Sequence, residues 1–465
     1  MTKTAKLPAL LAWPFLLLLG SCPILAAESV APAPVVRAGA TEKVCQLTGD
    51  IDWESGEPTA AKTFSNFGLD AVDLGYPVET GDKLILLFGD SWPPPHGGGA
   101  KGEIPPDDAV GEIVQKEPPN KDGGCLGLQV HSRHDPTPKF VPATIVGAVA
   151  IKQGFFNVPT GGVIANDRLF AFFWTDHCSA PSHLLPAPDD PLVRPAASQE
   201  CPETDDRNSV GRGVLAHSAD GGRTFTDVVP MPAGFVYPIA INATLQADLP
   251  QDQRLGIFIF GVARYRASAP YLAFSPVASL GDPGTWRFHA GRAPDGSPKW
   301  VTRDEWDQKT GNSVAWKPPG DSEVFIPAAG AGRCVGEYSV TWNRPLHMWL
   351  MLYNCRGEIA ARVAPAPWGP WSAPAIILGN ADSVACRLVM TPDGCGERRD
   401  YWPGRHVNGK FVKGIFYAPF VLDRYTIAAD RPGGRAATIY WLVSTWNPYE
   451  VSVMRSTLQS AARPP

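Results

Sequence analysis

Two aspartates that flank a short turn are the residues of this chain best placed to do chemistry together. Asp73 precedes and Asp90 follows the two-residue turn Gly81-Asp82, which pairs Thr80 with Lys83. Continued along both strands, that register places Asp73 directly opposite Asp90, with Cβ atoms roughly 4.5–5.5 Å apart. Two carboxylates this close cannot both ionise freely, and such pairs supply the acid and the base of sugar-cleaving sites. The alternative is structural: an Asx-turn at one aspartate and a strand end at the other.

The composition favours short strands over long helices as the elements that position this pair. The 465 residues include 46 Gly and 48 Pro, and only 19% of the residues are charged. Such a chain suits many strands joined by turns. The net charge of −5 is close to neutral for this length, which argues against a nucleic-acid partner.

Strand-like runs recur every few tens of residues, and hardly any stretch has helical periodicity with caps. This rhythm predicts an all-β protein of the β-propeller type, in which each blade buries its faces against its neighbours. The clearest runs are 83–88, 168–175, 213–217, 224–229, 254–260, 271–275, 338–342, 347–353, 358–364, 411–417, 437–444 and 451–456.

One turn motif supports the propeller. The segment from Ser218 to Phe225 reads Ser-Ala-Asp-Gly-Gly-Arg-Thr-Phe, which matches the S-x-D-x-G-x-T-[WF] Asp-box found between outer blade strands of sialidase-like propellers. Its aspartate closes the turn through hydrogen bonds to the backbone. We therefore expect a structural and not a catalytic role for it.

The N-terminus predicts export. Lys3 and Lys6 precede an apolar run over 7–19, which is the pattern of a signal peptide and is too short to span a membrane. We expect a signal peptide over 1–27, a flexible leader over 28–44 and a single propeller domain over 45–460. The alternative is a lipoprotein signal that ends before Cys22 and leaves a lipid anchor there. Either way the predicted location is secreted or periplasmic.

The other eight cysteines form an even set, which in an oxidising compartment predicts disulfides. Cys178 with Cys201, and Cys386 with Cys395, are candidate local pairs, although eight cysteines allow 105 connectivities. A zinc site is the weaker alternative, because no pair has C-x-x-C spacing.

Several motifs together resemble one known family. In chain order they are Val72-Asp73-Leu74-Gly75 with Leu87-Phe88-Gly89-Asp90-Ser91-Trp92, the runs 265–268 and 270–273, the runs 336–342 and 368–372, and the runs 444–449 and 453–456. They are similar to the family catalogued as domain of unknown function 4185. The resemblance implies a single five-bladed β-propeller. It also implies an activity, since members include endo-acting D-arabinanases that cut α-D-arabinofuranose polymers. This chain departs from the pattern by Pro- and Gly-rich insertions after Trp92 and Cys178, which leaves the particular glycan open.

The interpretation that follows is an exported, monomeric glycoside hydrolase acting on an arabinofuranose-containing polysaccharide or oligosaccharide. Asp73 and Asp90 are the predicted catalytic carboxylates, and neither the acid nor the stereochemical outcome can be assigned from the sequence. No cofactor or catalytic metal is expected, although a structural calcium ion in the channel would need no sequence signature. The alternative function is a non-catalytic carbohydrate-binding propeller. A sialidase-like enzyme is set aside, because the arginines do not stand at recognisable blade starts.

Four residues are candidates for substrate binding, each with a structural alternative. Trp92 can stack on a sugar ring or pack in the core. His177 can line the cleft or stand at its rim. Arg264, like its neighbour Arg266, can bind sugar hydroxyls or pair with a carboxylate. Glu337 can act as a third carboxylate or form a salt bridge at a strand end.

Overall fold

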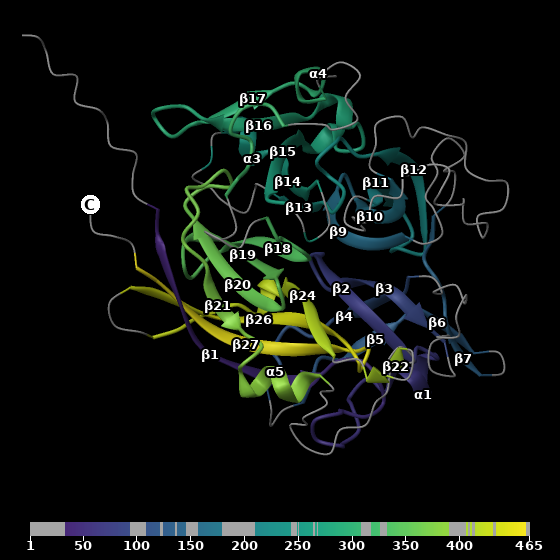
Figure 1. The fold of residues 1–465 in the computed structure, drawn as a ribbon. Helices are drawn as coiled ribbons and strands as arrows, with labels where there is room; N and C mark the ends of the chain where they lie inside the picture. The colour runs from purple at the N-terminus through teal and green to yellow at the C-terminus, as the bar shows by residue number, and fades with distance from the viewer. Residues whose placement is uncertain are drawn as a thin grey trace, which may run out of the picture.

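The computed structural model describes residues 33–93, 108–120, 124–134, 137–145, 157–178, 210–242, 249, 251–263, 266, 268–307, 318–325, 333–389, 406–407, 410–411, 414–430 and 434–461. These residues form five small sheets around a central channel, which is a five-bladed β-propeller (Figure 1). The predicted fold class is therefore confirmed. The first strands of the five blades contact one another around the channel.

The blades follow one another along the chain. Blade 1 is β2 (Ala71–Glu79), β3 (Leu84–Trp92), β4 (Val110–Ile113) and β5 (Leu128–Val130). Blade 2 is β9 (Asn157–Ala165), β10 (Arg168–Cys178), β11 (Val210–Ser218) and β12 (Thr224–Pro230), with β8 (Thr144–Ile145) parallel to β12. Blade 3 is β13 (Ile239–Asn242), β14 (Gly256–Val262), β15 (Pro270–Pro276), β16 (Arg287–Arg292) and β17 (Pro298–Val301).

Blade 4 is β18 (Tyr338–Asn343), β19 (Met348–Cys355), β20 (Glu358–Ala364) and β21 (Ala375–Leu378). Blade 5 is β24 (Ile415–Val421), β26 (Arg435–Trp446), β27 (Val451–Ala461) and β1 (Val35–Gln46), with β25 (Ile427–Ala428) beside β26. Outside the blades lie the hairpins β6 (Ser132–His134) with β7 (Pro138–Phe140) and β22 (His406–Val407) with β23 (Lys410–Phe411). The short helices are α1 (Thr63–Phe67), α3 (Gln251–Arg254), α4 (Arg303–Trp306), α5 (Ser383–Leu388), η3 (Val277–Ser279), η4 (Pro283–Thr285) and η6 (Asp423–Tyr425).

The ring is closed by the N-terminal strand. β1 pairs antiparallel with β27, from Val35 opposite Ala461 to Gln46 opposite Ser452, and so completes the last blade with the first strand of the chain. The prediction of a flexible leader through residue 44 was wrong from Val35 onward. The small and polar residues of this stretch resemble a linker, but the open edge of β27 supplies hydrogen-bond partners that only the folded ring brings within reach. Residues 28–32 lie outside the described part of the chain.

Two disulfides lie within the described residues. Cys45 of β1 joins Cys125, which precedes β5, and so ties blade 5 to blade 1. Cys334 joins Cys355 within blade 4. The pairs predicted for Cys178 and Cys386 each involve a partner outside the described residues. Disulfides indicate an oxidising environment, as in secreted or periplasmic proteins. None of the described helices has the length and apolar character needed to cross a membrane.

The Asp-box has the structural role predicted for it. It forms the turn between β11 and β12 on the outer side of blade 2. The Asp220 carboxylate accepts hydrogen bonds from the Ser218 hydroxyl at 2.7 Å and from the backbone N–H of Thr224 at 2.9 Å. These bonds stay within the turn, so this aspartate is part of the scaffold.

Side chains fill the middle of the channel. The Tyr76 ring packs edge-on against Phe420, with centroids 5.1 Å apart. The Tyr338 hydroxyl donates to the carbonyl of Tyr237 at 3.1 Å, which links blades 4 and 3. Both tyrosines are almost wholly buried. The two ends of the propeller are therefore separate surfaces, one where the innermost strands begin and one where they end.

Candidate active site

The predicted register of the first hairpin holds near its turn and changes before it reaches the aspartates. Glu79 pairs with Leu84 and Tyr76 pairs with Leu87, as the Gly81-Asp82 turn requires. Asp73 pairs with Gly89 and not with Asp90, so the predicted cross-strand pairing was wrong by one residue.

Two irregularities cause this shift. The register changes between Leu74 and Tyr76, where Leu74 has φ +60° and Gly75 has φ +78°. It changes back between Asp73 and Ala71, opposite Asp90, whose own φ is +22°. Each bulge places one extra residue on one strand and redirects its neighbours, which is common next to active sites. Non-glycine residues in this backbone region are strained by roughly 1–3 kcal/mol, and such strain gathers at functional sites.

The Asp73 carboxylate fits against Gly89 because glycine has no side chain. A Cβ added at Gly89 would lie 2.8 Å from Asp73 Oδ1 and 2.8 Å from the Leu74 side chain. The carboxylate thus lies against the backbone of its partner strand. Asp73 Oδ1 accepts no hydrogen bond from the described residues.

A tyrosine hydroxyl joins the two aspartates. Tyr449, in the loop between β26 and β27, has its hydroxyl oxygen 2.8 Å from Asp73 Oδ2 and 3.0 Å from Asp90 Oδ2. Tyr417 of β24 places its hydroxyl 2.8 Å from the same Asp73 oxygen. Blade 5 therefore supplies two phenols to the carboxylates of blade 1.

One proton on the carboxyl pair gives each of the three contacts its own hydrogen. The two phenols supply two hydrogens, and a proton on Asp73 or Asp90 supplies the third. One protonated and one ionised carboxyl is the arrangement that an acid and its partner base need.

The pKa values shift in the direction that keeps this proton. Burial, and next the negative charge of Asp90, raise the pKa of Asp73 well above its usual range, against the hydrogen bonds from Tyr417 and Tyr449. Burial also raises the pKa of Asp90, against the Tyr449 hydrogen bond. Burial and the nearby carboxylates raise the pKa of both phenols far above their usual range, so both hydroxyls remain donors.

Glu337 and Arg266 complete the described cluster. Arg266 Nη2 lies 2.8 Å from Glu337 Oε1, and its guanidinium lies 5.5 Å from the centre of the Tyr417 ring. Glu337 precedes β18 and is 1% exposed, and its charge contributes to the raised pKa of Asp73. The salt bridge predicted as the alternative for Glu337 is present, and the same carboxylate acts on the electrostatics of Asp73.

The three other residues predicted to bind substrate differ in where they lie. Trp92 is 6% exposed and packs against Ala71 and Tyr449, so its indole supports the site from within the core. His177 belongs to β10, in the half of that strand that pairs with the beginning of β9, and its role in binding sugar stays a prediction. Arg264 lies outside the described residues.

Access to the two aspartates differs. Asp73 is 7% exposed, whereas Asp90 is half-buried. A substrate at this end of the propeller would therefore meet Asp90 first. A pocket lined by the ends of the innermost strands includes neither aspartate. Among the described residues, no group of three His, Cys, Asp or Glu side chains is arranged to hold a metal ion, and a structural calcium stays a prediction.

Comparison with known proteins identifies a family and several distant solved structures. Residues 211–455 match the family described as "Domain of unknown function (DUF4185)", which is more than half of the chain. No curated protein matches. A protein of unknown function from Dyadobacter fermentans is 12% identical, with a TM-score of 0.39 over 91% of this chain and 99% of that one.

Two further solved structures are enzymes. A glycosyl hydrolase from Bacteroides ovatus is 10% identical, with a TM-score of 0.40 over 90% of this chain and 94% of that one. The β-xylosidase/α-arabinofuranosidase CoXyl43, from a compost microbial metagenome, is 8% identical, with a TM-score of 0.35 over 84% and 94%. Similarity at this level does not assign an activity or a substrate.

Proposed function

The chain belongs to the family DUF4185, and we propose that it is an exported glycoside hydrolase in which Asp73 and Asp90 are the catalytic carboxylates. The observation that carries the proposal is the Tyr449 hydroxyl, which lies within hydrogen-bond distance of both carboxylates. Glycoside hydrolysis needs one carboxylic acid and one carboxylate, and the three contacts of this cluster are satisfied by that charge state.

The hydrogen bonds favour one assignment of roles. Asp73 Oδ2 faces two phenols at 2.8 Å, which stabilise its ionised form. Burial and the Asp90 charge raise the pKa of Asp73 further than that of Asp90, which favours the opposite assignment. We give the two hydrogen bonds more weight, because the Asp90 charge no longer acts on Asp73 once Asp90 holds the proton. Asp73 is then the carboxylate that attacks the anomeric carbon or stabilises its positive charge. Asp90 is half-buried and carries the shared proton, so it protonates the leaving glycosidic oxygen.

The separation of the two groups favours retention of configuration. Because Tyr449 lies 2.8 and 3.0 Å from the two Oδ2 atoms, these atoms are within about 6 Å of each other. Retaining glycosidases have carboxyl groups roughly 5–5.5 Å apart, and inverting enzymes roughly 6.5–9.5 Å. The proposed substrate is an α-D-arabinofuranose-containing glycan, for which the support is the resemblance of the motifs along the chain to a family that includes endo-acting D-arabinanases.

The test is hydrolysis of D-arabinan by the wild type and by Asp73→Asn, Asp90→Asn and Asp82→Asn. Asp82 is an exposed aspartate in the turn of the same hairpin, so its variant controls for the change of residue type. We expect the first two variants to lose about 10²–10⁴-fold in rate and the third to keep the wild-type rate. Equal rates in all four proteins would remove these aspartates from the mechanism.

Azide can separate the two roles. In an Asp73→Ala variant, azide would take the place of the missing nucleophile and give a glycosyl azide of inverted configuration. In Asp90→Ala, azide would attack the glycosyl-enzyme intermediate and give the retained anomer. The opposite pattern would exchange the assigned roles.

One observation favours a second candidate function, a non-catalytic carbohydrate-binding propeller. Asp73 is 7% exposed, which is low for a group that must reach an anomeric carbon. In that case the wild type and the Asp73→Asn variant would both bind arabino-oligosaccharides in calorimetry, and neither would release products from D-arabinan.

A further inference from the structure

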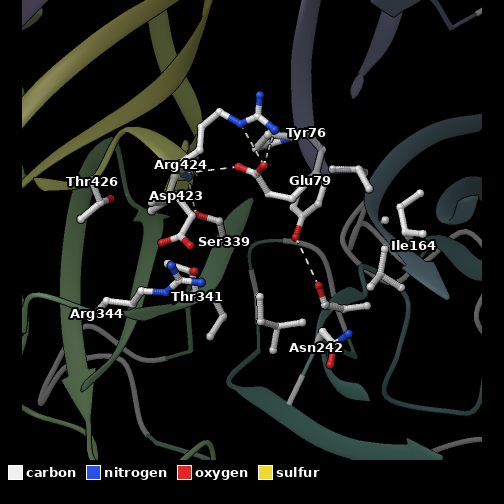
Figure 2. A pocket seen from close by; sticks show the side chains of 18 of the residues that line it. Tyr76, Glu79, Ile164, Asn242, Ser339, Thr341, Arg344, Asp423, Arg424 and Thr426 are labelled. Atoms are coloured by element: carbon white, nitrogen blue, oxygen red, sulfur yellow. Dashed lines mark hydrogen bonds and ion pairs between the residues drawn. The ribbon is translucent and has the colours of Figure 1, made fainter. Parts of the chain in front are cut away.

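The opposite end of the channel holds a pocket that the proposed hydrolysis does not use. Its volume is about 400 Å³, within the range of roughly 300–1,000 Å³ of small-molecule sites. Every blade contributes to it from the end of its innermost strand, as at Glu79 of β2, Ile164 of β9, Asn242 of β13 and Thr341 of β18, with Asp423 following β24 (Figure 2).

The pocket is separated from Asp73 by the filled middle of the channel. Tyr76 lies between them on β2, three residues after Asp73, and its ring packs against Phe420. Its hydroxyl is 3.5 Å from the carbonyl of Ala240 on the pocket wall. A molecule in this pocket would therefore bind at a site distinct from the two catalytic candidates.

The pocket is lined by two positively and two negatively charged side chains. Arg424 Nε donates to Glu79 Oε2 at 2.9 Å, and the Arg424 backbone N–H donates to Glu79 Oε1 at 3.3 Å. The Arg344 guanidinium lies beside the Asp423 carboxylate (Figure 2), and its charge favours the ionised form of that carboxyl. Two cations therefore face two anions, and the pocket offers no net charge to an ionic ligand.

The remaining lining combines hydrogen-bonding and apolar groups. Asn242 brings an amide that can donate and accept, whereas the Thr341 hydroxyl oxygen is buried in the pocket wall. Ile164, Val340 and Pro345 add apolar groups to the lining. Neighbouring donors and acceptors with apolar surface beside them match the hydroxyls and the C–H faces of a sugar ring.

We propose that this pocket is a second, non-catalytic binding site for one residue of a neutral carbohydrate, at the opposite end of the propeller from Asp73 and Asp90. Arg344 and Asp423 would hydrogen-bond vicinal hydroxyls from one side, and Asn242 would do so from the other. A small carboxylate or phosphate fits less well, because each arginine already faces a carboxylate.

The experiment uses the full chain with Asp73→Asn and Asp90→Asn, so that the proposed catalytic carboxylates are removed while the pocket stays unchanged. Binding of D-arabinose, D-galactose, D-mannose and D-glucose is measured by saturation-transfer-difference NMR, and Kd is obtained by titration. We expect at least one sugar to bind. Added singly, Arg344→Ala, Asp423→Asn and Asn242→Ala should each raise its Kd about tenfold or more. Arg37→Ala, an exposed arginine on β1, is the matched control and should leave Kd unchanged.

Three results would overturn the proposal. The first is that none of the four sugars binds. The second is that a sugar binds and no pocket variant weakens its binding. The third is that succinate or inorganic phosphate binds in place of sugar, in a manner that depends on Arg344. Circular dichroism of each variant tests whether it is folded. Because the three substitutions lie on separate strands and loops, the conclusion does not depend on one variant that fails to fold. Failure of the wild type to hydrolyse D-arabinan would count against the catalytic proposal alone.

Discussion

Asp73 and Asp90 share a hydrogen-bond partner that neither strand of their hairpin provides, the hydroxyl of Tyr449. Tyr449 belongs to blade 5 and the aspartates to blade 1, so the cluster forms where the first and last blades of the ring meet. The same two blades are joined by the Cys45–Cys125 disulfide, and β1 completes the last blade. The catalytic proposal therefore depends on closure of the propeller and not on the hairpin alone.

Replacing Tyr449 by Phe should move the pH dependence of hydrolysis. The hydroxyl lowers the pKa of both Asp73 and Asp90, so its loss raises both. The carboxylate that must be ionised then ionises at higher pH, and the acidic limb of the kcat/KM profile shifts upward. We also expect a loss of about 10–100-fold in kcat, since a positioned hydrogen-bond donor is removed.

The matched control is Tyr425→Phe. Tyr425 is buried, and its hydroxyl donates to the carbonyl of Gln115 at 2.7 Å, away from the aspartates. Each variant thus loses one buried phenol. An acidic limb that stays in place in Tyr449→Phe, or moves equally in Tyr425→Phe, would show that Tyr449 does not act on the carboxyl pair.

A methyl group at Gly89 should disable the site without touching a titratable residue. The new Cβ would meet Asp73 Oδ1 and the Leu74 side chain, each at 2.8 Å, so the carboxylate must shift from its present position. We expect Gly89→Ala to lose at least about tenfold in kcat, because small misplacements of reacting groups are costly. Gly81→Ala in the turn of the same hairpin has no atom within 4 Å of its Cβ and should keep wild-type kcat. Equal kcat in the two variants would rule out this packing requirement.

The blades could be predicted from the sequence because their cause is local. Runs such as Ile257-Phe258-Ile259-Phe260 are apolar on both faces, and β14 is buried along its whole length between neighbouring blades. The hairpin register was also correct from its turn to Tyr76. It changed at Gly75, and a glycine inside a strand is itself a signal of a bulge, which the register of a simple two-residue turn does not include.

The site could be predicted only in part, since its members are far apart in the chain. Asp73 and Asp90 are close in sequence and were found together. Tyr417 and Tyr449 are 344 and 376 residues from Asp73, and the sequence analysis did not include them in the site. Buried phenols have the sequence pattern of ordinary core aromatics, and only the closed ring shows which hydroxyls reach a carboxylate.

The two disulfides within the described residues should contribute unequally to stability. Cys45 and Cys125 are 80 residues apart, and Cys334 and Cys355 are 21 apart. By chain entropy the longer loop stabilises the fold by about 4.5 kcal/mol and the shorter by about 3 kcal/mol. Denaturant unfolding of the Cys45→Ala/Cys125→Ala and Cys334→Ala/Cys355→Ala proteins measures both. A smaller loss for the first pair would mean that β1 stays in place without its covalent link.

Asp423→Asn should stabilise the protein at neutral pH more than at acidic pH. Burial, then the charge of Glu79, raise the pKa of Asp423 from 3.8 to about 6, so the folded state binds this proton more tightly than the unfolded chain. The contribution of the wild-type carboxyl to the free energy of unfolding is therefore greatest below pH 3.8 and falls as the pH rises to about 6. Asparagine cannot ionise, so the gain from the substitution should grow over this window to about 1–3 kcal/mol and remain constant above it. Urea unfolding at pH 4 and pH 7 measures the gain, and Asp430→Asn, at an exposed aspartate, should show none. A gain equal at both pH values would mean that Asp423 does not titrate in this window.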